Sequence, residues 1–178
     1  MADEARWEQY LLAGEKAYHQ GDYAEAVRQT QHALKEAENF GEEDPGFAVS
    51  LDRLGRLYQL GGRYAEAERL FKHSLGIWET VLGPEHDYMA TILSNLAELY
   101  RMQSRYAEAE PLYKRSLAIL EKMQDPEHSD VAMSLNNLAW LYDDQGRHAE
   151  AEPLFKRSLK IWETVLGSGH LNAAIRPR

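Results

Sequence analysis

One seven-residue segment occurs twice in this chain of 178 residues. The segment IWETVLG runs from Ile77 to Gly83 and returns unchanged from Ile161 to Gly167, 84 residues later. The length of one repeat is half of that distance, because the same residue types also recur at intervals of 42. The recurring residues are Leu54, Leu96 and Leu138; Tyr58, Tyr100 and Tyr142; Ala67, Ala109 and Ala151; and His86, His128 and His170. A fixed period of this length is the signature of a repeat architecture, in which each small unit stacks on the next.

A more divergent copy precedes these three. Residues Gly21–Ala26 read GDYAEA and match GRYAEA at Gly62–Ala67, at an offset of 41 residues. The chain is therefore predicted to contain four repeats and a short tail. The predicted boundaries are 5–46, 47–88, 89–130 and 131–172, with residues 173–178 as the start of a next helix that is absent.

Each repeat is expected to form two antiparallel helices. Leu51, Leu54 and Tyr58 recur at spacings of three and four, which places them on one stripe of a first helix. The glycine pair 61–62 interrupts this pattern, and a second apolar stripe follows within Ala67–Trp78. Neither stripe is buried by one pair alone, so neighbouring pairs must stack to complete the core. Trp78 is expected to belong to that core. The predicted fold class is all-α.

Composition narrows the functional classes. The chain has no cysteine, which excludes a disulfide framework and a thiolate zinc site. Its net charge of −9 and the lack of a Lys/Arg-rich run argue against a nucleic-acid partner. No apolar run approaches the roughly 20 residues that span a bilayer, and the N-terminus is acidic where a secretory signal is basic. We therefore expect a cytoplasmic protein with no nucleic-acid and no membrane partner.

Two side-chain patterns invite chemical interpretations. The three recurring histidines could suggest a metal site, but stacked helices stand roughly 10 Å apart, whereas zinc needs its nitrogens at about 2 Å. Each histidine is expected to organise its own loop instead. His148 lies close to Glu150 and Glu152 in sequence, which could suggest acid-base catalysis. Other repeats carry tyrosine at the place of His148, so the glutamates are expected to form a solvated helix face. The sequence predicts no enzyme, no metal and no cofactor.

The repeat resembles the tetratricopeptide repeat, and in particular the 42-residue form found in kinesin light chains. The resemblance rests on LNNLAWLY at Leu135–Tyr142 and AEAEPLFKRSL at Ala149–Leu159, and it extends over nearly the whole chain. It implies a right-handed α-solenoid of four helix-turn-helix repeats. It also implies a scaffold or adaptor that binds another protein, although such repeats serve unrelated proteins.

In that family the first helices line a concave groove, which holds an extended or short helical peptide. Asn95 and Asn137 occupy places where family members hold a ligand's backbone through the side-chain amide. Trp140 has polar equivalents, Arg56 and Glu98, so a large exposed ring there is a candidate hot spot. The groove is expected to be basic in its middle, and to take an acidic ligand with an apolar anchor. The expected contact residues are Arg53, Arg56, Asn95, Arg101, Met102, Asn136, Asn137 and Trp140.

The end of the chain supports an alternative. No polar capping helix follows the last repeat, although solenoids usually need one. Parts of Trp162 and Leu166 are therefore expected to be exposed. Copies of the chain could then stack into homo-oligomers through this end, or the chain could be a fragment of a longer array, such as the sensor of a larger signalling protein.

Overall fold

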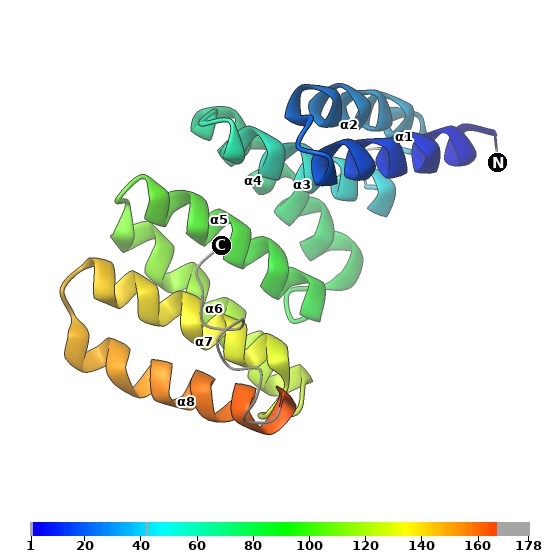
Figure 1. The fold of residues 1–178 in the computed structure, drawn as a ribbon. Helices are drawn as coiled ribbons and strands as arrows, with labels where there is room; N and C mark the ends of the chain where they lie inside the picture. The colour runs from blue at the N-terminus through cyan, green and yellow to red at the C-terminus, as the bar shows by residue number, and fades with distance from the viewer. Residues whose placement is uncertain (1, 42, 167–178) are drawn as a thin grey trace. The chain divides into compact units, whose positions relative to one another are not determined.

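The computed structural model describes residues 2–41 and 43–166. These residues form eight α-helices and one 3₁₀ turn, and they contain no strand (Figure 1). The helices are α1 (Ala2–His19), α2 (Tyr23–Ala37), α3 (Pro45–Leu60), α4 (Tyr64–Leu82), α5 (Asp87–Met102), α6 (Tyr106–Met123), α7 (Ser129–Asp144) and α8 (His148–Leu166); the turn η1 is Glu38–Phe40. Helices α3, α5 and α7 begin two residues before the predicted repeat boundaries.

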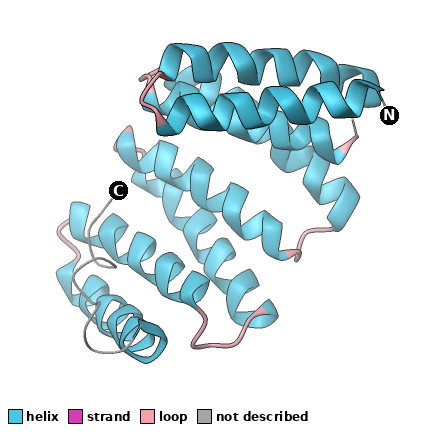
Figure 2. Ribbon diagram, turned by 45° about the vertical axis from the view of Figure 1, so that its right-hand side comes forward, coloured by secondary structure: helices cyan, strands magenta, loops and turns pink. Residues whose placement is uncertain are grey.

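The helices associate in sequential pairs: α1 packs on α2, α3 on α4, α5 on α6, and α7 on α8. Short loops join them (Figure 2). The chain divides into two compact units, unit 1 up to Glu85 and unit 2 from His86. Within unit 1, α2 also packs on α3, and within unit 2, α6 packs on α7. Each unit is therefore two stacked helical pairs.

The leucines, tyrosines and alanines that recur at intervals of 42 lie in the cores of the last three pairs, as predicted. The leucine, tyrosine and alanine series are all buried, and so is Trp78. Small residues lie where first and second helices come closest. At Gly55 an added Cβ would lie 2.8 Å from Cε1 of Phe71, whose ring is fully buried. The aromatic ring therefore occupies the space that the absent side chain leaves.

A buried serine also ties each of three second helices to its first helix. The hydroxyl donates to the carbonyl of a buried alanine 26 residues earlier, which satisfies a polar group that would otherwise be costly to bury. The bonds run from Ser74 to Ala48 (3.0 Å), from Ser116 to Ala90 (2.8 Å) and from Ser158 to Ala132 (2.8 Å).

The turn inside each pair needs one residue with a left-handed backbone. Gly21, Gly62 and Gly146 have φ of 78°, 74° and 71° at this place. The third repeat has Ser104 there, with φ of 58°. Glycine adopts this conformation without a steric penalty, whereas a residue with a Cβ does not. Ser104 is thus strained where its counterparts are not.

Substituting Ser104 with glycine is expected to stabilise the protein by about 0.5 kcal/mol. Removing the left-handed strain gains roughly 1 kcal/mol, and the extra freedom of glycine in the unfolded chain takes back part of it. The reverse substitution at the matched position, Gly146→Ser, should destabilise by a similar amount. Urea unfolding of both variants checks the pair, and a Ser104→Gly variant that is less stable than wild type would contradict it.

The recurring histidines begin the first helices of unit 2. Nδ1 of His86 accepts the backbone N–H of Tyr88, and Nδ1 of His128 accepts that of Asp130, each at 3.2 Å. The side chain thus satisfies one of the open N–H groups of a helix N-terminus. The expected loop-organising role is confirmed for these two residues. His170 and the predicted tail 173–178 lie outside the described residues.

Candidate peptide-binding surface

In unit 1, the candidate residues Arg53 and Arg56 lie one turn apart on α3. The Arg56 side chain is exposed, and Nη1 of Arg53 lies 3.3 Å from Oε2 of Glu15 on α1. The ion pair shows that α1 and α3 share one solvent-facing surface. Leu12, which has the place of Arg53 in the first repeat, is 66% exposed on it. This surface therefore combines cationic and apolar groups.

In unit 2, Arg101 connects the ends of α5 and α7. Its Nε and Nη2 each donate to Glu98 at 2.8 Å, and its Nη1 pairs with Asp144. The hydroxyl of Tyr113 donates to Glu98 at 2.7 Å. Burial opposes ionisation of Glu98, but the bonds from Arg101 and Tyr113 hold its pKa below the ordinary value. Arg101 already contacts two carboxylates, so an acidic ligand would have to compete with Asp144.

The two candidate asparagines, Asn95 on α5 and Asn137 on α7, occupy the same repeat position and are half-buried. Met102, at the end of α5, is 45% exposed. Asn136 is half-buried and has the repeat position of Ser94. The Ser94 hydroxyl shares a 2.8 Å hydrogen bond with the Ser116 hydroxyl of α6, so this position faces the second helix. Asn95, Asn137 and Met102 are thus the candidate groups on α5 and α7 that fit the expected surface best.

Trp140 differs from expectation. Its ring is half-buried, not largely exposed, because Phe155 of α8 packs edge-on against it with ring centroids 5.2 Å apart. The indole Nε1 is buried and has no hydrogen-bond acceptor among the described residues. A buried donor without a partner is uncommon in folded proteins. Part of the Trp140 side chain therefore remains accessible, and its contact with a ligand stays a prediction.

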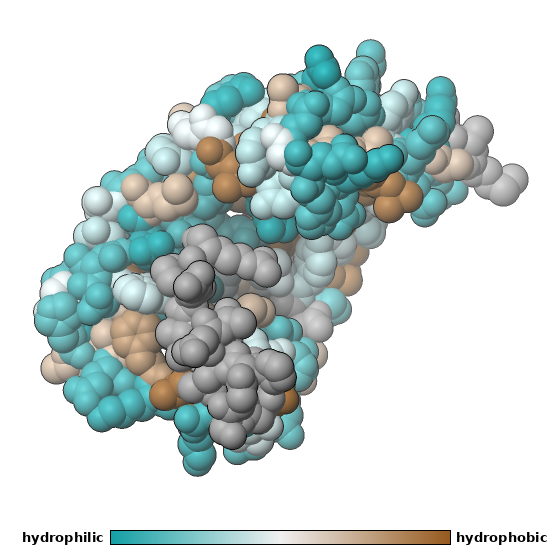
Figure 3. All heavy atoms as spheres, in the orientation of Figure 1, coloured by the Kyte–Doolittle hydropathy of each residue, from teal (hydrophilic) through white to brown (hydrophobic). Residues whose placement is uncertain are grey.

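Exposed apolar side chains are scattered over the molecule. On the face drawn in Figure 3, hydrophobic residues form small separate patches among hydrophilic ones. Trp162, predicted to be partly exposed at the end of the last repeat, is half-buried, and Val165 on the next turn is 47% exposed. The Leu166 side chain and residues 167–178 are not described, so the predicted homo-oligomer through this end stays a prediction.

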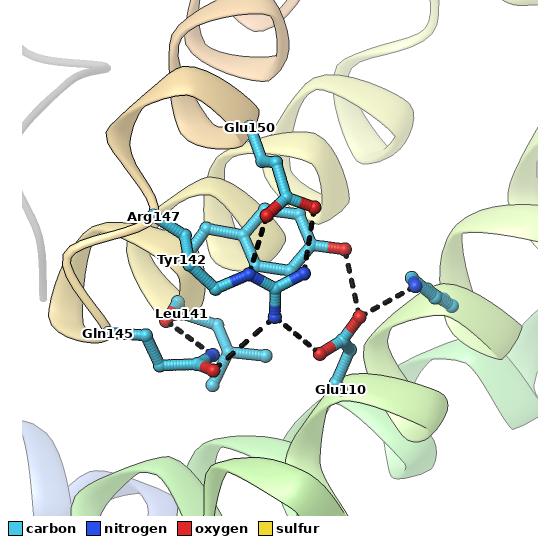
Figure 4. Close-up of polar contacts among 7 residues, drawn as sticks. Glu110, Leu141, Tyr142, Gln145, Arg147 and Glu150 are labelled. Atoms are coloured by element: carbon cyan, nitrogen blue, oxygen red, sulfur yellow. Dashed lines mark hydrogen bonds and ion pairs between the residues drawn. The ribbon is translucent and has the colours of Figure 1, made fainter.

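A second polar cluster links two repeats of unit 2 (Figure 4). The guanidinium of Arg147 lies over the Tyr142 ring, 4.1 Å from its centroid. Its Nε and Nη2 donate to Glu150 at 2.6 and 2.8 Å, and its Nη1 donates to Glu110 of α6 at 2.7 Å. Glu110 also accepts bonds from the Tyr142 hydroxyl at 3.2 Å and from Lys114 at 2.6 Å. Glu150 is thus part of a structural ion-pair network.

This network shifts the acidity of Glu110. The bonds from Arg147 and Lys114 lower its pKa to about 2, because they stabilise the carboxylate over the acid. The residues that the sequence linked to acid-base chemistry also form ion pairs: Glu152 pairs with Lys156, and His148 with Asp143.

Among the described residues, no helix is both long enough and apolar enough to traverse a bilayer.

Comparison with known protein families agrees with the resemblance seen in the sequence. The tetratricopeptide repeat family model matches four overlapping segments, residues 10–80, 48–122, 88–164 and 130–175. The comparison with curated proteins gives no match.

Several solved structures share the fold. The crystal structure of BtubC (BKLC) from P. vanneervenii superposes with a TM-score of 0.82 at 23% identity, covering 97% of this chain and 67% of that one. A Podosopora anserina protein with nearly identical TPR-like repeats, named for kinesin light chain, gives 0.74 at 24% identity, covering 91% and 77%. The apo form of RapI gives 0.79 at 19% identity, covering 90% and 57%. At these identities the likeness shows the fold alone.

Proposed function

Because this chain belongs to the tetratricopeptide repeat family, we propose that its first helices bind a peptide segment of a partner protein. Proteins of this fold generally serve as non-catalytic scaffolds for protein interactions. The proposed ligand is an acidic segment with an apolar residue that contacts Met102 or Trp140. The observation that carries the proposal is the composition of the first-helix surfaces. Side chains outside the packing stripes there are polar, charged, or exposed and apolar, and the arginines Arg53 and Arg56 are among them.

The ion pairs indicate where the acidic part of the ligand should bind. Arg53 and Glu15 are 39% and 47% exposed, so their pair contributes little, on the order of 0–1 kcal/mol, and is easily exchanged for a ligand carboxylate. Arg101 is 24% exposed and holds two carboxylates, which makes exchange there less favourable. Ligand carboxylates should therefore prefer Arg53 and Arg56 to Arg101.

The asparagines suit a different part of the ligand. A side-chain amide both donates and accepts, so it can bond the N–H and C=O of one extended peptide residue. Asn95 and Asn137 place such a group at equivalent points of α5 and α7. Removing both amides should therefore weaken binding of any peptide sequence, whereas removing the arginines should act only on acidic peptides.

The proposal is tested with peptides selected for binding to the immobilised chain. Their dissociation constants are then measured by fluorescence anisotropy. We expect the double variant Arg53→Glu/Arg56→Glu to bind acidic peptides about tenfold more weakly or worse, since about 1.4 kcal/mol of interaction is lost. The matched control, Lys72→Glu/Lys156→Glu, carries the same charge change on the second helices α4 and α8. Equal weakening by both variants would indicate non-specific electrostatics and would contradict the proposal.

A further inference from the structure

A small cavity lies in unit 1, where α2 packs on the end of α3. Its volume is about 350 Å³. Tyr23, Val27 and Leu60 form much of its apolar wall, while Tyr58 and Arg63 contribute polar groups. Tyr23 and Leu60 are 56% and 61% exposed, so the cavity is open to solvent. It is built from α2, the last turn of α3 and the turn that follows α3, and neither Arg53 nor Arg56 lines it.

The equivalent place in unit 2 is filled by the chain itself. Glu110 of α6 has the repeat position of Val27, and Gln145 has that of Gly61. Both side chains reach Arg147, whose Nη1 donates to Glu110 at 2.7 Å and to Gln145 at 3.3 Å (Figure 4). In unit 1 a shorter apolar residue and a glycine replace them. The cavity is thus the space that a carboxylate and an amide occupy in the other unit.

Arg63 is arranged like Arg147 but has one carboxylate partner fewer. Its Nε donates to Glu66 at 2.7 Å, its Nη2 pairs with the same carboxylate, and its guanidinium lies 3.7 Å from the Tyr58 ring centroid. In Arg147 the remaining nitrogen, Nη1, binds Glu110. No described residue supplies a carboxylate to Nη1 of Arg63. Its side chain is accordingly 45% exposed, against 31% for Arg147.

Tyr58 offers a second donor at the same place. In unit 2 the equivalent hydroxyl, that of Tyr142, donates to Glu110. In unit 1 the Tyr58 hydroxyl accepts a bond from Gln31 Nε2 at 2.9 Å, which leaves its own proton available to donate. The donors that surround a carboxylate in unit 2 therefore have counterparts in unit 1 without that carboxylate.

We propose that this cavity binds an acidic side chain of a partner polypeptide together with an apolar residue next to it. The carboxylate takes the place that Glu110 has in unit 2 and accepts bonds from Arg63 Nη1 and the Tyr58 hydroxyl. The apolar residue lies against Tyr23 and Leu60, where it covers two exposed hydrophobic side chains. This is a second binding site, distinct from the one proposed at Arg53 and Arg56.

Two short peptides, acetyl-Leu-Glu-amide and acetyl-Leu-Gln-amide, test the carboxylate requirement on the full chain. They differ only in the charge of one side chain. In NMR titrations the acidic peptide should shift the Arg63 guanidinium and Leu60 methyl signals in a saturable way. The neutral peptide should bind about fivefold more weakly or worse, as expected for the loss of a charge-assisted hydrogen bond. Equal binding of the two peptides, or no saturable shift with either, would overturn the proposal.

The variant Val27→Glu tests the location. It restores the carboxylate that the later repeats carry, so it should abolish the shifts caused by acetyl-Leu-Glu-amide while raising the thermal midpoint. Lys35→Gln is the matched control, because it makes the same change of net charge elsewhere on α2 and should leave binding within about twofold. Unchanged binding by Val27→Glu refutes the site. The proposal is also refuted if the Arg63 and Leu60 signals shift with protein concentration alone, because a second copy of the chain would then occupy the cavity.

Discussion

Replacing Phe71 with alanine is expected to lower the free energy of unfolding by about 3–5 kcal/mol, the usual cost of removing a fully buried aromatic ring. The Phe71 side chain has no solvent exposure and lies directly over Gly55, where a Cβ would meet its ring at 2.8 Å. The loss combines the transfer free energy of the ring with the cavity that it leaves. Urea unfolding followed by circular dichroism measures it.

The effect of Gly55→Ala should reverse its sign with the residue at position 71. In the wild type the new methyl group collides with Phe71, which costs about 1–3 kcal/mol and outweighs the gain of roughly 1 kcal/mol in helix propensity. In the Phe71→Ala background the methyl group enters the cavity, and the substitution should stabilise. Gly76→Ala on α4 is the control, because an added Cβ there meets nothing within 4 Å and should stabilise both backgrounds. The same sign for Gly55→Ala in both backgrounds would refute this account of the contact.

Substituting Glu110 with glutamine is expected to cost about 2 kcal/mol at neutral pH. The side chain is 22% exposed and accepts bonds from Arg147, Lys114 and Tyr142, and bonds to a charged group contribute more than neutral ones. Glu152 has the same repeat position but pairs only with Lys156 among the described residues, and its side chain is 65% exposed. Glu152→Gln should therefore change stability by less than about 0.5 kcal/mol.

The cost of Glu110→Gln should also depend on pH. The pKa of Glu110 is lowered from 4.5 to about 2 by folding, so its carboxylate stabilises the folded state fully above the unfolded value. That contribution is lost as the pH falls from about 5 through the folded value of about 2. The difference in urea midpoint between wild type and Glu110→Gln should shrink accordingly between pH 7 and pH 2.5. If the difference in urea midpoint stays constant over this pH interval, the charge of the Glu110 carboxylate does not stabilise the folded state.

The sequence was sufficient to predict the helical pairs, because the residues that pack the two helices of a pair against each other lie within one repeat. Tyr58 and Leu54 recur with their spacing, and their burial follows from it. The ion pairs between neighbouring repeats were not predicted from the sequence. The signal for Arg147 was present, since Arg63 and Arg105 precede it at intervals of 42. Its partner Glu110 lies on the preceding repeat, however, and their approach depends on how α6 packs against α7.

The candidate surface was predicted less well for a related reason. Periodicity indicates which residues leave the packing stripe, but not what then covers them. The sequence indicated that Arg101 is cationic and Trp140 is outside the stripe, yet Asp144 binds the first and Phe155 covers the second. Both partners come from other helices. Side-chain pairing across helices depends on their rotation about their own axes, which a period of 42 does not specify.

The central claim, that the first helices bind a peptide, is tested most directly at Asn95 and Asn137. A peptide selected for binding is titrated into the labelled chain, and the two side-chain amide signals are followed by NMR. We predict that both signals shift with one common midpoint, equal to the dissociation constant from anisotropy. If both amide signals stay unshifted when the peptide is saturating, the first helices of unit 2 do not hold it, and the claim fails.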